Sequence, residues 1–131
     1  MTHKHLICPI GYMLIVFILS SIPMDRQIEG VNFLINLNSD IQNLLHIPLF
    51  GCLSVLWIKA LERYNIRYSN IVFRTLTITI LFGIFDEIHQ YFVPGRFASF
   101  MDMLLNIMGS LFGVAAYSVY LRKHVKRLNQ G

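Results

Sequence analysis

Residues 86–96 read DEIHQYFVPGR, and Ser99, Asp102 and Asn106 follow shortly after. This polar stretch lies between two apolar runs, each long enough to cross a membrane. A charged side chain at the centre of a bilayer costs roughly 2.5–3.5 kcal/mol on insertion scales. Because such residues are rare within membrane segments unless they have a function, the stretch marks the candidate site of an integral membrane protein.

The composition of the whole chain supports this interpretation. Apolar residues make up 55% of the 131 residues and charged residues only 14%, and the mean hydropathy is +0.56. Soluble domains usually carry about 25% charged residues. The length fits one domain that covers residues 1–131. Cys8 and Cys52 lie in apolar runs, so we expect both to be small buried residues without a disulfide.

Four apolar runs approach the length of about 20 residues that a membrane-spanning helix needs. They cover residues 6–23, 41–61, 71–93 and 98–121. The first run also resembles a signal peptide, with Lys4 before it and Ser20 and Ser21 near its end. The three later runs favour an uncleaved first helix. We therefore predict an all-α fold, a four-helix transmembrane bundle.

The basic residues predict the orientation of these spans. Four crossings leave both termini on one side, and that side receives nine of the eleven Lys and Arg residues: Lys4, Lys59, Arg63, Arg67, Arg74, Arg122, Lys123, Lys126 and Arg127. The opposite side receives only Arg26 and Arg96, together with every acidic residue except Glu62. Cytoplasmic loops carry an excess of Lys and Arg. We therefore predict that both termini are cytoplasmic and that the polar stretch faces the other side.

Polar side chains of three spans are predicted to lie at similar depths. A helix rises 1.5 Å per residue, which places the amides Asn43, Gln90 and Asn106 each about 24 Å from the nearest cytoplasmic basic residue. His46 lies nearly level with Asp86 by the same measure. We therefore expect one shared polar cavity in the outer half of the membrane.

The helical spacing also predicts which side chains share a face. Asp86, His89 and Gln90 are three and four positions apart and share one face. Glu87 points about 100° away from Asp86, so we do not expect both acids to enter one site. Either acid, or Asp102, is a candidate general acid or base. The alternative is that these acids are structural ion-pair partners, for example of Arg96.

The remaining candidates are residues that could hold a ligand. Arg96 suits a phosphate or carboxylate because its guanidinium donates two parallel hydrogen bonds, although a headgroup anchor or a partner of Asp102 is an equal alternative. The three amides suit ligand contacts or hydrogen bonds between helices. Ser99 is a candidate ligand contact or nucleophile, but its spacing to Asp102 favours a helix N-cap. Gly109 and Gly113 continue the stripe of Asp102, where another helix could approach closely.

His46, together with Asp86, Asp102 and His89, would form a plausible mixed nitrogen and oxygen metal site. The sequence has no close ligand pair of the HExxH kind, so we predict no metal and no cofactor. The basic C-terminal tail suits anionic lipids and does not resemble a nucleic-acid reader. The expected partners are membrane lipids or a lipid-linked envelope precursor, with a second copy or another membrane protein as a further possibility.

The polar stretch resembles the VanZ-like family of small bacterial membrane proteins. The shared pattern is an Asp-Glu pair, a Gln, a Pro-Gly-Arg turn, then Ser, Asp, Asn and spaced Gly: Asp86, Glu87, Gln90, Pro94, Gly95, Arg96, Ser99, Asp102, Asn106, Gly109 and Gly113. The second span adds Asn43, His46, Pro48 and Gly51. Many members have an Asp-Lys pair before the His, where this chain has Gln42 and Asn43.

The resemblance implies a multi-pass protein of the bacterial cytoplasmic membrane, and a named relative is linked to resistance to the glycopeptide teicoplanin. It supplies no reaction, so whether the protein is an enzyme stays open. The leading hypothesis is binding or modification of a lipid-linked or phosphorylated envelope component, with a possible effect on teicoplanin susceptibility. The alternatives are a non-enzymatic interaction subunit and a proton-coupled transporter, which would have to oligomerise because four spans form a narrow bundle.

Overall fold

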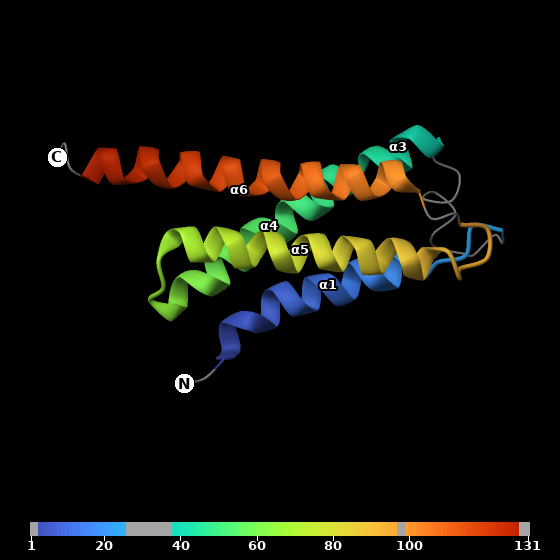
Figure 1. Ribbon diagram of the computed structural model, residues 1–131, viewed down its shortest axis with the longest axis horizontal. Coiled ribbons are helices and arrows are strands. Elements are labelled where there is room, and N and C mark those ends of the chain that lie inside the picture. Colours follow the sequence, from blue (N-terminus) through green and yellow to red (C-terminus); the bar gives the residue numbers. More distant parts are fainter. Residues whose placement is uncertain (1–2, 26–37, 97–98, 129–131) are drawn as a thin grey trace.

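The computed structural model of the chain (Figure 1) describes residues 3–25, 38–96 and 99–128. Within these ranges every regular element is a helix: η1 (His3–Leu6), α1 (Ile7–Ser20), α3 (Ser39–Leu44), α4 (His46–Leu61), η2 (Glu62–Tyr64), α5 (Tyr68–Gln90) and α6 (Phe100–Leu128). The predicted all-α fold is confirmed for this part of the chain.

Helix α4 is the centre of the bundle and packs against α6, α5 and α1. Its closest approach is to α6, where Gly51 lies against Gly113 and a carbon added at Gly109 would lie 2.9 Å from the Cα of Ile47. Small residues allow this approach because no side chain separates the two backbones. The glycine stripe that the sequence predicts as a helix-packing surface therefore packs against α4.

The interior and the surface of the bundle have reversed polarity. Apolar side chains such as Leu53 form a core, but Asp86 and Glu87 are also buried, with exposed fractions of 1% and 0%. Large apolar side chains cover the outside, among them Phe73 at 72% exposed and Phe112 at 69%. This distribution is typical of a protein whose solvent is a bilayer, because lipid accepts apolar surface and penalises exposed charge.

Two helical segments of the described chain, Ile41–Tyr64 and Phe100–His124, are long and apolar enough to cross a membrane. The first helical segment, Lys4–Ser20, is apolar but shorter. The 23 residues of α5 include Arg74 and the buried acidic pair. These features indicate a membrane protein, while four crossings and cytoplasmic termini stay predictions.

The helix ends differ from the predicted spans in several places. The first helix ends at Ser20 instead of Pro23, and the third runs from Tyr68 to Gln90. The predicted second span is divided at Leu45, between α3 and α4. Pro48 explains this break, because proline has no N–H to donate to the carbonyl four residues earlier and its ring crowds that carbonyl. The fourth helix continues to Leu128, past the predicted end of its span.

Two further expectations can be compared with the structure. Cys8 and Cys52 are not joined to each other, but both are exposed, so the prediction that they are buried is wrong. Each lies on an outward face of its helix, which an apolar span also tolerates. Ala98, at the predicted start of the fourth span, lies outside the described residues, as do Arg26 and Glu29 and the side chains of Lys126 and Arg127.

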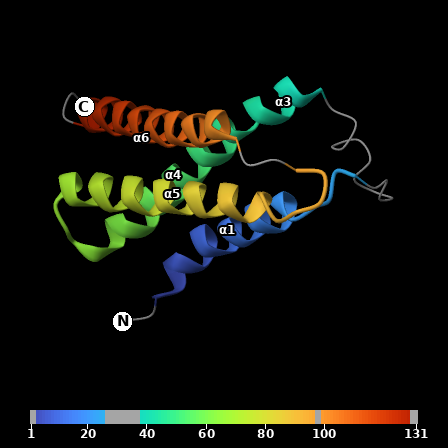
Figure 2. The same cartoon turned by 45° about the vertical axis from the view of Figure 1, so that its right-hand side comes forward.

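The loops gather at two ends of the bundle (Figures 1 and 2). At one end, which we call the basic end, the rings of His5 and Tyr64 lie 4.8 Å apart and the hydroxyl of Tyr117 donates to Glu62 over 2.8 Å. This end carries Lys4, Lys59, Arg63, Arg67, Arg122 and Lys123. At the opposite end the N–H of Met24 donates to the carbonyl of Pro94 over 3.1 Å. The start of α1 and the C-terminal half of α6 therefore lie toward the same end of the bundle.

Candidate functional site

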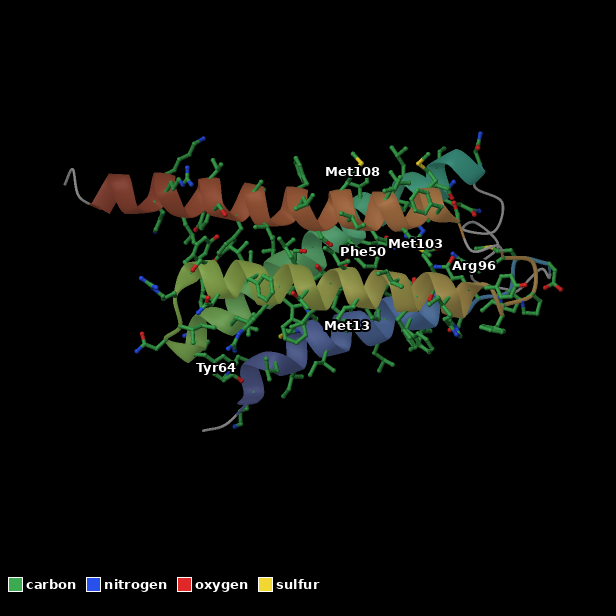
Figure 3. All side chains as sticks on the ribbon, in the orientation of Figure 1. Met13, Phe50, Tyr64, Arg96, Met103 and Met108 are labelled. Atoms are coloured by element: carbon green, nitrogen blue, oxygen red, sulfur yellow. The ribbon has the colours of Figure 1, made fainter. Side chains whose placement is uncertain are left out.

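A cavity of about 520 Å³ lies toward the end opposite the basic end. Its walls come from α1, α3, α4, α5, α6 and the turn after α5, where Figure 3 places Arg96. Polar side chains form one part of the wall: Ser20, Gln42, Asn43, His46, Asp86, Gln90, Arg96, Ser99 and Asp102. Apolar side chains such as Val16, Leu19 and Phe50 form the rest. The cavity is therefore amphipathic.

The structure brings most of the predicted site residues together. Seven of them line the cavity: Asn43, His46, Asp86, Gln90, Arg96, Ser99 and Asp102. Glu87 and Asn106 are buried behind this lining, with exposed fractions of 0% and 1%. His89 lies to one side, where its Nε2 is 2.9 Å from the hydroxyl of Ser21 and its ring stands 4.3 Å from that of Phe17. The expected grouping of amides and acids is thus present, with His89 apart from it.

Gln90 forms hydrogen bonds both with Arg96, in the turn after α5, and with the two acids of α5. Its Oε1 accepts hydrogen bonds from Arg96 Nε at 3.0 Å and Nη2 at 2.7 Å. Its Nε2 donates to Asp86 Oδ2 at 2.9 Å and to Glu87 Oε1 at 3.4 Å. We expected only one acid to enter the site, and of the two only Asp86 lines the cavity. Both contact the same amide because Gln90 follows them by four and three positions on the helix.

Asp86 faces α1. The hydroxyl of Ser20 donates to Asp86 Oδ1 over 2.5 Å, and both side chains are buried. Ser20 and Gln42 also line the cavity, although neither was among the predicted site residues. A hydroxyl in the last turn of an apolar helix, level with the acids, was the signal for Ser20. For Gln42 the only signal was its place in the family pattern, just before His46, where many members have an Asp-Lys pair.

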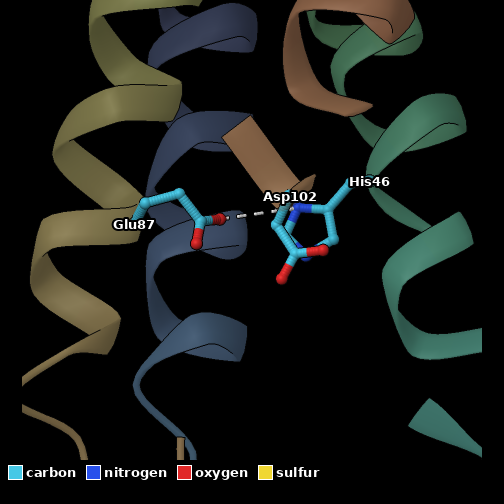
Figure 4. A group of neighbouring side chains, drawn as sticks. All are labelled: His46, Glu87 and Asp102. Atoms are coloured by element: carbon cyan, nitrogen blue, oxygen red, sulfur yellow. Dashed lines mark ion pairs between the residues drawn. The ribbon is translucent and has the colours of Figure 1, made fainter. Parts of the chain in front are cut away.

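Glu87 faces α4 and α6. Its carboxylate accepts from the backbone N–H of Ser99 at 3.4 Å and from Asn106 Nδ2 at 3.5 Å, and it lies 3.9 Å from His46 Nδ1. Asn106 Oδ1 in turn accepts from His46 Nδ1 at 2.8 Å. Figure 4 shows His46, Glu87 and Asp102 converging from three different helices. The two acids of α5 therefore lie on opposite sides of one polar network, Asp86 toward α1 and Glu87 toward α4 and α6.

The turn between α5 and α6 determines where Arg96 lies. Gly95 has a φ of 76°, which glycine adopts without the penalty that a Cβ would bring. A side chain at Gly95 would also meet the backbone of Asp25. After the turn, Ser99 Oγ accepts the N–H of Asp102 at 3.3 Å and caps the first turn of α6. The Pro-Gly-Arg turn and this cap together direct Arg96 toward Gln90.

One family model matches most of the chain. The model of the VanZ/LLP1 family matches residues 6–121, which contain every residue that lines the cavity. The chain belongs to the VanZ/LLP1 family. Neither a curated protein nor a solved structure matches it significantly. Membership confirms the resemblance that the motif from Asp86 to Gly113 carries.

The charges around the cavity of this VanZ/LLP1 protein are unequal. Asp86, Glu87 and Asp102 face one guanidinium and one imidazole. Burial lowers the pKa of Arg96, while the three carboxylates raise it. An arginine keeps its proton over the whole physiological range, so Arg96 presents a fixed positive charge in the wall of an otherwise acidic cavity. Such a site can hold an anion at Arg96 and exchange protons at the acids.

Proposed function

We propose that this VanZ/LLP1 protein crosses the bacterial cytoplasmic membrane four times, with both termini in the cytoplasm and the cavity facing the outer side. The separation of charge supports this orientation, because the basic end lies opposite the cavity and cytoplasmic segments carry more Lys and Arg. A reporter that works only in the cytoplasm should be active when it is fused to the C-terminus. A C-terminal reporter that is active only outside would contradict the orientation.

We further propose that the cavity binds a cell-envelope component with an anionic headgroup, either lipid-linked or phosphorylated. The observation that carries this proposal is Arg96, half-buried in the cavity wall and held in place by Gln90. A guanidinium suits phosphate and carboxylate oxygens. Val16 and Leu19 on the α1 wall offer apolar surface for the adjoining hydrocarbon. Charge and apolar surface thus lie as they do in an amphipathic lipid.

In the enzymatic form of this proposal, Asp86, Glu87 or Asp102 transfers a proton to or from the bound group. Substituting Asp86→Asn or Glu87→Gln removes the titratable proton and keeps most of the shape. Both variants should accumulate normally and lose activity. This outcome separates proton transfer from simple binding, because binding at Arg96 needs neither carboxylate to titrate.

A second function is favoured by the number of polar contacts that the network makes within the protein. Ser20 bonds to Asp86, and His46 bonds to Asn106 across two helices, as expected of polar groups that hold membrane helices together. In this form the protein is a non-enzymatic interaction subunit. Asp86→Asn should then retain much of the function, since the amide oxygen still accepts the hydrogen bond from Ser20 and only the bond from Gln90 Nε2 is lost.

Native mass spectrometry of the protein in lipid nanodiscs tests the headgroup proposal. The wild type should carry a bound phospholipid or isoprenoid phosphate, and Arg96→Ala should lose it. Arg63→Ala removes an exposed guanidinium at the basic end and should keep the bound mass. The proposal fails if folded wild type carries no specific mass, or if both variants lose it equally.

A cellular measurement complements this experiment. In a strain whose teicoplanin susceptibility changes when the wild-type protein is produced, Arg96→Ala should abolish the change and Arg63→Ala should preserve it. Membrane levels of both variants are compared by immunoblot. An unchanged effect of Arg96→Ala at equal protein level would remove the cavity from the explanation.

A further inference from the structure

Three potential metal ligands converge at the inner wall of the cavity. His46 comes from α4, Glu87 from α5 and Asp102 from α6, and one ligand atom of each lies within 4.8 Å of the other two. Figure 4 shows the three side chains pointing toward one another. From this arrangement we propose that His46, Glu87 and Asp102 bind one divalent transition-metal ion, Zn²⁺ or Mn²⁺.

The spacing suits a small ion after a modest contraction. Zn²⁺ binds nitrogen and carboxylate oxygen at about 2.0–2.2 Å, so two of its ligands stand about 3.3–3.6 Å apart in a tetrahedral site. The longest separation in the cluster exceeds this range by about an ångström, which rotation of a Glu or Asp side chain can supply. The donor set of one imidazole and two carboxylates also matches Mn²⁺.

Asp102 gives independent support for a ligand at this place. It is 6% exposed, lines the cavity, and its buried Oδ1 has no hydrogen-bond partner among the described residues. A buried polar atom without a partner costs roughly 1–3 kcal/mol, and more when it is charged. A cation beside Oδ1 would remove that cost and balance the excess of carboxylates over positive groups. Arg96 alone does not achieve this, because it supplies one positive charge against the three carboxylates Asp86, Glu87 and Asp102.

The surroundings of His46 prepare the ring for metal binding. Asn106 Nδ2 points to Glu87, so Asn106 Oδ1 must be the atom that accepts from His46 Nδ1. This bond places the ring proton on Nδ1, the nitrogen that lies 3.9 Å from Glu87 Oε1, and leaves the lone pair on Nε2, so the ring must turn to bring Nε2 to the ion. A second hydrogen bond of this kind orients most metal-binding histidines. Asn106 is therefore a positioning residue for the imidazole.

The metal proposal goes beyond the headgroup proposal and does not depend on it. His46, Glu87 and Asp102 can hold an ion whether or not a lipid occupies the cavity. A bound ion would nevertheless add positive charge next to Arg96, where an oxyanion would be attracted by both. The two proposals can thus fail separately.

The test uses the full-length protein in nanodiscs, treated with a chelator and then equilibrated with Zn²⁺, Mn²⁺, Mg²⁺ or Ca²⁺ in separate samples. Inductively coupled plasma mass spectrometry measures the bound metal per chain, and the fluorescence of Trp57 follows thermal unfolding. We expect one Zn²⁺ or Mn²⁺ per chain, a higher unfolding temperature with the ion, and little response to Ca²⁺. Substoichiometric binding of both transition metals at saturating concentration would overturn the proposal.

Variants locate the ion and separate the two proposals. Glu87→Gln and Asp102→Asn should lose stoichiometric binding, and Asn106→Ala should weaken it about 10- to 100-fold by freeing the imidazole. Asp25→Asn, an exposed acid outside the cluster, should bind as the wild type does. Arg96→Ala should keep the metal and lose only the headgroup. Equal binding by Glu87→Gln and wild type would overturn the proposed site.

A spectroscopic measurement covers the case in which a ligand variant does not fold. Mn²⁺ bound to the wild type is examined by pulsed electron paramagnetic resonance for coupling to a directly bound nitrogen. A single imidazole coupling is expected from His46. Stoichiometric Mn²⁺ without nitrogen coupling would place the ion elsewhere and overturn the assignment.

Discussion

Replacing Gly109 by alanine should push α4 and α6 apart next to the candidate site. The added Cβ would lie 2.9 Å from Ile47 Cα and 3.1 Å from its carbonyl carbon, with the carbonyl oxygen nearer still. Carbon atoms pack at about 3.5–4.0 Å, so the two backbones must separate by at least roughly 0.6 Å. Because the obstacle is backbone, no side-chain rotation relieves the contact. His46 precedes Ile47 and would move with it.

The expected cost follows from two opposing terms. Overpacking a core costs typically about 1–3 kcal/mol, and rigid backbone neighbours favour the upper half of that range. Replacing glycine by alanine within a helix returns roughly 0.5–1 kcal/mol. The free energy of unfolding should therefore fall by about 2 kcal/mol.

Gly11 provides a matched control for this substitution. A Cβ at Gly11 on α1 would meet nothing within 4 Å, so Gly11→Ala should leave stability unchanged or raise it by up to about 1 kcal/mol. Unfolding is measured in mixed micelles with increasing dodecyl sulfate, followed by circular dichroism and by fluorescence of Trp57. The packing argument is refuted if Gly109→Ala is as stable as the wild type, or if both variants change equally.

Three further predictions concern contacts around the cavity. Gly83→Ala should fall between the two glycine variants, because its nearest neighbours lie 3.1 Å from the added carbon, farther than the nearest backbone atoms that a Cβ at Gly109 would meet. Ser99→Ala should lower the free energy of unfolding by about 0.5–2 kcal/mol through loss of the α6 cap, and Ser99→Thr should restore most of it. Ser20→Ala should lower the free energy of unfolding by about 1–3 kcal/mol because Asp86 loses a buried donor, whereas Ser69→Ala, at an exposed position, should cost nothing measurable. The same micelle titration measures these variants. Equal stability of Ser20→Ala and Ser69→Ala would contradict the role of the Ser20–Asp86 bond.

The sequence predicted the site well where helical geometry alone decides positions. Counting residues from the basic anchors placed Gln90 and Asn106 at one depth, and the structure brings both to the same carboxylate, that of Glu87. The capping spacing from Ser99 to Asp102 was equally informative. Both inferences depend only on the rise per residue and the preferences of a helix start, which neighbouring helices do not alter.

Tertiary packing decided what the sequence could not. Helical spacing predicted correctly that Glu87 and Asp86 point to different sides of α5. Whether each of these sides faces protein or lipid depends on how α1, α4 and α6 surround α5. Cys8 and Cys52 illustrate the same point, since an apolar run does not reveal which of its faces is outward. The break at Leu45 was visible in Pro48 but was outweighed by the continuous apolar pattern.

The contacts of Gln90 fix the orientation of its side-chain amide. Its amide oxygen accepts from Arg96 on one side, and its NH2 group donates to the acids on the other. If the amide were reversed, its NH2 group would face the N–H groups of Arg96 and its oxygen would face the carboxylates. An anion that draws Arg96 away would remove one half of that restraint. The hydrogens that Gln90 donates to Asp86 and Glu87 would then be held less firmly. Binding of an anion at Arg96 would thus weaken the hydrogen bonds of the buried acids without the movement of any helix.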